Sequence, residues 1–223
     1  MSDRNKPCHA ETTQDGAAAA TAGTGTRHET DRSDPARDAA FVIERTRRWI
    51  DRVVIDLNLC PFARRELDGG HVRFAVTRAQ APEYLLTDLL RELRLLQDDE
   101  TIATAFLIHP GALRDFLAYN DFLDDVDRLL QSERLEGVFQ VASFHPDYRF
   151  AGTAAEDAEN FSNRSPWPML HLLREDSVAA AVAQHPDAEG IPERNIAMLR
   201  RVGSDALRAR LRDCLDVDPS KST

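Results

Sequence analysis

Three apolar, strand-length segments alternate with two amphipathic, helix-length segments in the middle of the chain. The strand-length segments span residues 72–77, 101–108 and 137–144. Between them, apolar residues recur at helical spacing over residues 82–97 and 112–131. A helical crossover is long enough to return the chain to the starting edge of a sheet, so the pattern predicts parallel strands in an α/β layer. A ferredoxin-like α+β sheet with antiparallel neighbours is the alternative.

Helical patterns also precede and follow this alternation. A first helix is predicted to begin at Asp34-Pro35, where Asp can cap and Pro suits the first position, and to run to Asn58. Thr153 and Glu156 have capping-box spacing, which predicts a short helix to about residue 161. Ser165 and two following prolines predict a further helix that carries the leucines up to residue 173. The last predicted helices span residues 177–184, 193–201 and 205–215.

These elements define the expected fold. We predict an α/β (or α+β) domain with a small, mostly parallel sheet of about three or four strands, helices around it in two or three layers, and a helical C-terminal part. Residues 1–33 lack apolar residues other than alanine, Met1 and Cys8, so they predict a disordered tail. Residues 34–216 form one predicted domain, and residues 217–223 a frayed end. With 223 residues, of which 42% are hydrophobic, the chain can bury one core.

Charge and composition exclude several classes of partner. A formal net charge of -10 and a pI of about 5.2 oppose broad binding to the phosphate backbone of nucleic acids. The longest apolar runs are strand-sized, and the N-terminus has no signal-like apolar core, so we expect no membrane contact and a cytoplasmic protein. Three cysteines without metal-like spacing fit a reducing compartment.

Two histidines close predicted strands in the same way. His109 and His145 each end a strand and are each followed by proline, which holds them extended. Ligands of open parallel sheets bind at the carboxyl ends of the strands, so the two imidazoles are expected to converge, with Asp147 beside them. His171 joins them if its helix lies against that edge. Histidines with one carboxylate are a ligand set suited to zinc or iron, so the predicted cofactor is a divalent metal ion. The alternative is that each histidine is only hydrogen-bonded at a strand end.

The predicted helix start after Asn163 indicates a second kind of site. A helix N-terminus has free N–H groups and a partial positive charge, and Arg164 adds a bidentate donor, so Asn163, Arg164 and Ser165 are expected to hold phosphate or carboxylate. Arg149 and Arg174 are candidate members of the same anion site. The alternative is that Ser165 only caps the helix and Arg164 pairs with an acid.

Cys60 allows three interpretations. It precedes Pro61, which fixes its backbone, and it is a nucleophile, a metal ligand or a buried small apolar residue. His171 and Glu175 are four residues apart, which on a helix would place them on one face as an oriented base or as an ordinary surface pair.

Four segments of the chain carry a resemblance to a known family. They are NLCPFA at 58–63, SFHPDYRF at 143–150, NRSPWPMLHLLRE at 163–175 and IPERNI at 191–196. Together they resemble the domain of unknown function 1415, an uncharacterised bacterial family, over about residues 38–203. The resemblance implies no activity; it implies that these segments form one site.

Two functional hypotheses follow. The first is an enzyme, such as a metal-dependent hydrolase or oxidoreductase, that acts on a small anionic substrate through His109, His145 and Asp147. The second is a non-catalytic module that binds an anionic metabolite or supports an assembly.

Overall fold

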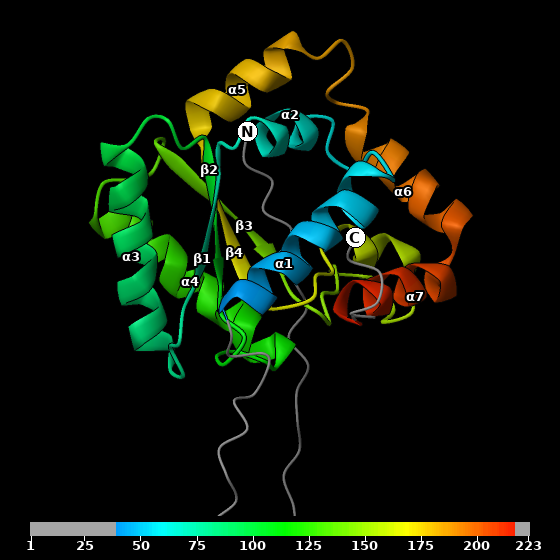
Figure 1. The fold of residues 1–223 in the computed structure, drawn as a ribbon, viewed down its shortest axis with the longest axis horizontal. Helices are drawn as coiled ribbons and strands as arrows, with labels where there is room; N and C mark the ends of the chain where they lie inside the picture. The colour runs from blue at the N-terminus through cyan, green and yellow to red at the C-terminus, as the bar shows by residue number, and fades with distance from the viewer. Residues whose placement is uncertain (1–38, 217–223) are drawn as a thin grey trace, which may run out of the picture.

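Four strands form one mixed sheet at the centre of the computed structural model, which describes residues 39–216 (Figure 1). The strands are β1 (Val72–Val76), β2 (Thr104–Ile108), β3 (Phe139–Phe144) and β4 (Met169–Arg174), in the order β1-β2-β4-β3. The β1 and β2 strands pair in parallel, and β4 is antiparallel to both of its neighbours. The α/β class is therefore confirmed, while the sheet is mixed and not mostly parallel, because β4 lies antiparallel between β2 and β3.

The β4 strand replaces a predicted helix. Residues 165–168 are not helical, and Met169–Arg174 is a strand. A strand buried on both faces presents a nearly continuous apolar run, and such a run has no period that separates it from a buried helix. Proline at position 168 fits just before a strand, where its missing N–H is not needed; its carbonyl accepts the His109 N–H at 3.0 Å.

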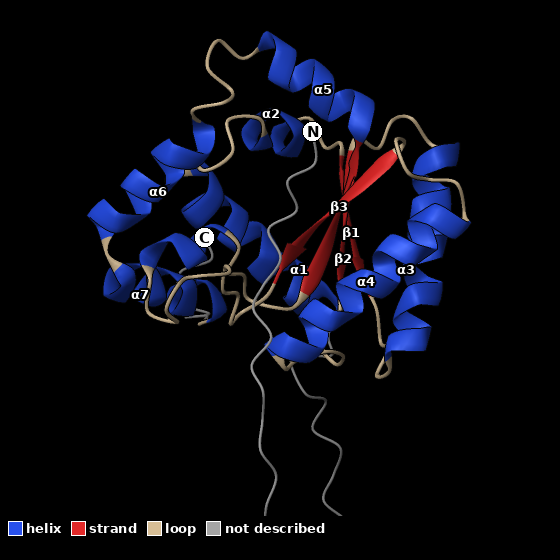
Figure 2. Cartoon of the chain, turned by 180° about the vertical axis from the view of Figure 1, so that it is seen from behind, coloured by secondary structure: helices blue, strands red, loops and turns tan. Residues whose placement is uncertain are grey.

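Helices cover both faces of the sheet and make three layers (Figures 1 and 2). One face is covered by α3 and α4, and the other by α1, η2, α2, α6 and α7, while α5 crosses one end of the sheet. The bounds are α1 (Ala39–Trp49), π-helix η2 (Ile50–Ile55), α2 (Ala63–Asp68), α3 (Pro82–Asp98), α4 (Phe116–Ser132), 3-10 helix η3 (Ala158–Ser162), α5 (Glu175–Gln184), α6 (Ile191–Val202) and α7 (Ser204–Leu215). The predicted tail (residues 1–33), the predicted start of the first helix at Asp34-Pro35 and the predicted frayed end (residues 217–223) lie outside the described residues.

Alternating residues of the central strands divide the core into two halves. Ala105 and Leu107 of β2 belong to the half packed under α3 and α4. Phe106 and Ile108 belong to the other half, together with Trp49. All five residues of β2 are buried, as expected for a strand covered by helices on both sides. Among residues 39–216, no helix combines the length and the apolar character needed to cross a membrane.

Proline, an aspartate cap and glycine mark some of the helix ends. Pro82 begins α3, and the Asp115 carboxylate accepts the Ala118 N–H at 2.9 Å, so α4 begins later than the predicted residue 112. Gly203 ends α6 with φ of 84°, a backbone conformation that glycine adopts without a steric penalty. The α2 helix was not predicted from the sequence pattern.

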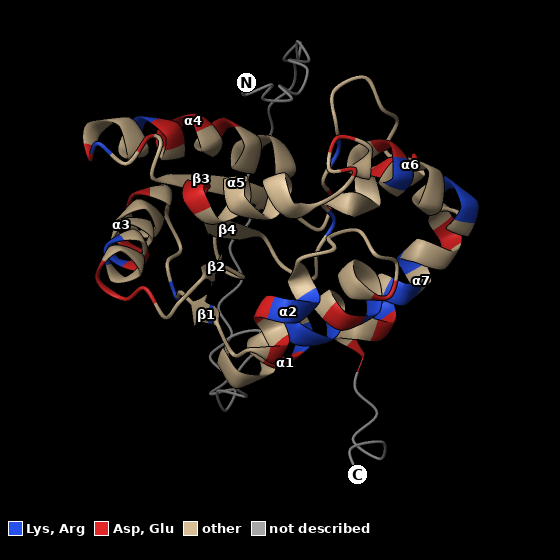
Figure 3. Ribbon diagram, turned by 90° about the horizontal axis from the view of Figure 1, so that it is seen from above, with Lys and Arg blue, Asp and Glu red and all other residues tan. Residues whose placement is uncertain are grey.

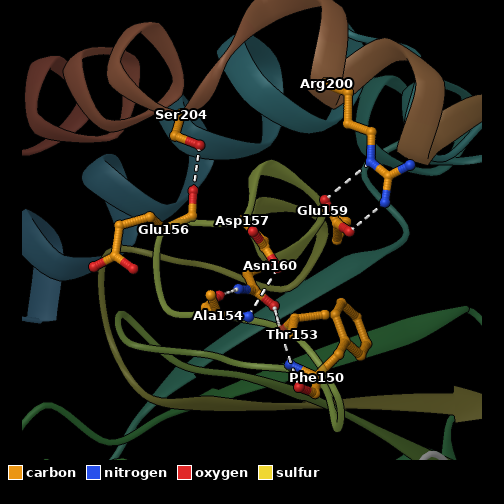
Figure 4. A network of polar contacts seen from close by, with 9 residues as sticks. All are labelled: Phe150, Thr153, Ala154, Glu156, Asp157, Glu159, Asn160, Arg200 and Ser204. Atoms are coloured by element: carbon orange, nitrogen blue, oxygen red, sulfur yellow. Dashed lines mark hydrogen bonds and ion pairs between the residues drawn. The ribbon is translucent and has the colours of Figure 1, made fainter.

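The loop from residue 150 to 160 is organised by a buried asparagine (Figure 4). The Phe150 N–H and the Thr153 hydroxyl donate to Asn160 Oδ1 at 3.0 and 2.8 Å, and Asn160 Nδ2 donates to the Ala154 carbonyl at 2.7 Å. The predicted capping box at Thr153 and Glu156 is wrong, because the threonine hydroxyl bonds to Asn160 and the following turn is the 3-10 helix η3. Arg200 of α6 pairs with Glu159 at 2.6 Å and so ties this loop to the helical layer.

Replacing Asn160 by alanine is expected to lower the free energy of unfolding by about 2 kcal/mol, because three polar groups of the loop lose their partner. Urea denaturation measures the change. Glu156→Ala is the matched control: this exposed residue contacts Ser204 through its main-chain carbonyl, so its free energy should change by less than about 0.5 kcal/mol. Equal effects of the two substitutions would contradict the organising role of Asn160.

Candidate functional site

A cavity of about 630 Å³ lies on the α1 and η2 side of the sheet, at the end that α5 crosses. Its floor comes from the strands, through Thr104, Phe106, Ala142 and His171. Its walls come from η2, from the segment of residues 60–67 that includes α2, and from α5. The volume is within the range of about 300 to 1,000 Å³ that small-molecule sites have.

Most of the cavity lining is apolar. The aromatic rings of Trp49, Phe62, Phe106 and Phe144 contribute, and α5 adds alanine and valine side chains. Figure 3 shows that α5 has acidic residues only at its start and no basic residue along its length. None of the α5 residues is buried, although five of them line the cavity. An apolar wall with a few polar groups is typical of a small-molecule site.

His171 is the polar group at the centre of the cavity floor. It lies in the middle of β4, opposite Phe106 of β2 and Ala142 of β3. Its ring stacks on the Phe106 ring with centroids 4.0 Å apart, and its Nε2 lies 2.7 Å from the Thr104 hydroxyl. Burial lowers the pKa of His171 to about 3, so the imidazole is neutral at pH 7.

Cys60 also lines the cavity. It follows the π-helix η2 and Asn58, which has a positive φ of 52°, and the Asn195 side chain holds the preceding Leu59 carbonyl at 2.8 Å. Burial raises the pKa of the Cys60 thiol, so the thiol is protonated at neutral pH. This supports the apolar interpretation of Cys60 over the nucleophile, since the thiolate is the reactive form.

Arg174 is held by main-chain carbonyls at the edge of the cavity. Its Nε donates to Ile102 O at 3.2 Å, and its Nη2 donates to Asp99 O at 3.0 Å and to Leu96 O. These carbonyls include those at the C-terminus of α3, where a cation is favoured. Arg174 therefore joins β4 to α3, and its predicted part in an anion site has no support in these contacts.

His109 and His145 lie at the same edge of the sheet, on the face covered by α3 and α4. Both are fully buried, and both rings contact the Tyr119 ring, with centroid separations of 5.7 and 5.1 Å. Their ring nitrogens are 3.1 and 3.2 Å from the carbonyls of Ala112 and Leu113. Burial lowers the pKa of His109 to about 4 and also lowers the pKa of His145. These contacts favour the alternative that each histidine is a hydrogen-bonded strand end, while a catalytic role stays a prediction.

The predicted metal ligands do not assemble. His145 Nδ1 accepts the Asp147 N–H at 3.0 Å, the Asp147 residue is exposed, and His171 lies on the opposite face of the sheet. Within residues 39–216, no group of three or more His, Cys, Asp or Glu side chains is placed to hold a metal ion. His171 was expected on a helix beside the other two, and its position in β4 removes both that cluster and the predicted helical pair with Glu175.

The predicted anion site has no helix N-terminus. Residues 163–165 instead run alongside His145, whose N–H donates to Asn163 O at 3.2 Å. Asn163 Nδ2 donates to Ser143 O at 3.0 Å, and the buried Ser165 hydroxyl donates to Trp167 O at 2.6 Å. Arg164 donates to Tyr148 O at 3.1 Å and to Ala155 O at 2.6 Å, with its guanidinium over the Phe161 ring. Arg164 is thus engaged with the main chain, and Arg149 is exposed.

The family model described as "Protein of unknown function (DUF1415)" matches residues 41–209. The chain belongs to the DUF1415 family. No curated protein and no solved structure matches it.

Three of the four segments that carry the DUF1415 resemblance contribute side chains to the cavity lining. Residues 60–63 of the first segment line its wall, and residues 171, 173 and 174 of the third line its floor and edge. The fourth segment supports the first through the bond from Asn195 to Leu59. The second segment contributes only Phe144 to the cavity lining, and the rest of it lies around His145 at the other end of the sheet, so the four segments of this DUF1415 protein do not form a single site.

Sequence reasoning missed Thr104, Gln140 and the α5 residues as parts of the site. Thr104 begins an otherwise apolar strand, and His171 is surrounded by leucines in the sequence. A polar residue inside an apolar run was therefore the signal that could have indicated these site residues. The signal does not decide between a binding site and a core, because buried polar residues that are hydrogen-bonded are also common in cores.

Proposed function

We propose that this DUF1415 protein binds a small, largely apolar molecule in the cavity between the sheet and α5. The observation that carries the proposal is the cavity itself, about 630 Å³ lined by aromatic and aliphatic side chains around a few polar groups. A concave space of this volume with mostly apolar walls and a few polar groups is the usual form of a small-molecule site.

Binding is favoured over catalysis by the state of the polar groups in the cavity. The imidazole of His171 is neutral, and the thiol of Cys60 is protonated. A general base needs a pKa near the operating pH, and a cysteine nucleophile needs a lowered one. The hypothesis of an enzyme for anionic substrates rests on His109, His145 and Asp147. His109 and His145 are buried against main-chain carbonyls, so these observations support ligand binding more strongly than catalysis.

Filling the cavity with a side chain tests this function. Ala181 lines the cavity, whereas Ala183 of the same helix is exposed and is not part of the lining. We expect Ala181→Phe to weaken binding of the aromatic probe para-ethylanisole by about tenfold or more, because the added ring occupies the space of the probe. Isothermal titration calorimetry measures the affinity.

Ala183→Phe is the matched control, because it makes the same substitution in the same helix at a position outside the cavity lining. It should leave the affinity within about twofold of the unaltered protein. No binding of the probe to the unaltered protein, or equal effects of the two substitutions, would refute binding in the cavity. Urea denaturation of both variants checks that a loss of binding does not come from unfolding.

A further inference from the structure

The hydrogen bonds around His171 determine which of its ring nitrogens carries the proton. The Thr104 hydroxyl lies 2.6 Å from the Leu172 carbonyl and 2.7 Å from His171 Nε2. A carbonyl oxygen only accepts, and a hydroxyl has a single proton, so Thr104 donates to Leu172 O. The hydroxyl oxygen must then accept from His171, which places the imidazole proton on Nε2. Nδ1 is therefore the ring atom with the free lone pair.

Nδ1 has no hydrogen-bond partner within residues 39–216. The buried side-chain atoms without a partner include His109 Nε2 but not His171 Nδ1, so Nδ1 is accessible from the cavity that the ring lines. Stacking on Phe106 at an interplanar angle of 8° holds the ring in place. The cavity floor thus presents one hydrogen-bond acceptor in a fixed position.

We infer that the ligand of this cavity carries a neutral hydrogen-bond donor, such as an alcohol or phenol hydroxyl, that binds His171 Nδ1. This inference rests on the proposed binding function. A carboxylate has no proton to donate to this acceptor. The cations near the cavity are already engaged, because Arg174 donates to three carbonyls and Arg65 pairs with Glu66 at 3.1 Å. Burial keeps the imidazole from becoming a donor cation, since its pKa is about 3.

Three probes with the same apolar body separate the ligand classes. They are para-ethylphenol, which donates, para-ethylanisole, which only accepts, and para-ethylbenzoate, which is an anion. We expect the phenol to bind the unaltered protein roughly three- to tenfold more tightly than the anisole, the range for one net hydrogen bond. The benzoate is expected to bind most weakly. Calorimetric titration at neutral pH measures all three.

Two substitutions assign the difference to His171. His171→Phe keeps a stacked ring and removes the acceptor, so the ratio of the phenol affinity to the anisole affinity should fall to about one. Thr104→Val removes the hydroxyl that fixes the imidazole proton on Nε2, and it should reduce the same advantage without removing the ring. Comparing the unaltered protein and Thr104→Val tests the inference even where His171→Phe does not fold.

The outcomes distinguish this inference from the proposed function. If the anisole binds and Ala181→Phe blocks it, but the phenol has no advantage, the cavity binds ligands and the inference is wrong. Tightest binding of the benzoate would also overturn it and indicate an anion site. If neither neutral probe binds, both proposals fail.

Discussion

Replacing Arg164 by alanine is expected to lower the free energy of unfolding by about 3 kcal/mol. The guanidinium makes two hydrogen bonds, to Tyr148 O and Ala155 O, and hydrogen bonds from a charged donor contribute roughly 1.5 to 3 kcal/mol each. Part of this is recovered because Ala155 is exposed and its carbonyl can bind water. Arg164→Lys should restore only part of the loss, because an ammonium keeps the charge but lacks the planar fork that reaches both carbonyls.

Urea denaturation of the two variants measures these changes, and Arg149→Ala is the control. Arg149 was predicted to belong to the same anion site and is exposed, so its replacement should change the free energy of unfolding by less than about 0.5 kcal/mol. A thermal-shift comparison with phosphate tests the competing anion site. An unchanged stability of Arg164→Ala, together with the loss of a phosphate-dependent shift, would show that Arg164 binds anions and is not a structural residue.

Acidification from pH 6 to pH 5 is expected to lower the free energy of unfolding by about 2 kcal/mol through His109 and His171. Their folded pKa values are about 4 and about 3, below the value of about 6.5 in the unfolded chain. Below pH 6.5 the unfolded chain therefore binds protons that the folded protein does not. The contribution of these two histidines to the free energy of unfolding is fully present above pH 6.5 and is lost as the pH falls toward the folded pKa values, by about 1 kcal/mol for each histidine between pH 6 and pH 5.

Urea denaturation at several pH values between 7 and 5 measures this slope, in a range above the titration of most carboxylates. His171→Phe should reduce the loss of stability between pH 6 and pH 5 by about 1 kcal/mol, because one of the two proton-binding differences is removed. Leu173→Val, at another position of the cavity lining, is the control, since it should lower the stability equally at each pH and leave the slope unchanged. A slope that His171→Phe leaves unaltered would mean that this imidazole is not desolvated in the folded protein.

Elements with one buried face were predictable from the sequence. The α3 helix has leucines on one side at helical spacing, with Leu85, Leu89 and Leu93 fully buried, and its predicted bounds agree with the structure to within one residue at its end. The α6 helix was marked by Pro192 at its start and Gly203 at its end. Each signal reflects local physics, namely burial of one helix face or the backbone preference of proline and glycine.

The β4 strand and everything that depends on it were not predictable in this way. Its residues are apolar on both sides because β2 and β3 flank it and helices cover it, and the preceding prolines fitted a helix start equally well. That one error placed His171 on a helix beside His109 and His145, and it supplied a helix N-terminus for Arg164. The buried strand therefore affected two separate functional predictions.

The sequence by itself determined the DUF1415 family, the α/β class, most helices, and the two histidines that end strands, because these depend on patterns within a short stretch of chain. Only the tertiary structure decided that β4 lies between β2 and β3, since strand order depends on contacts between residues far apart in the sequence. It also decided where the cavity lies. Thr104, Cys60 and His171 are separated by more than a hundred residues at their extremes, and only packing of the sheet against η2 and α5 brings them around one volume.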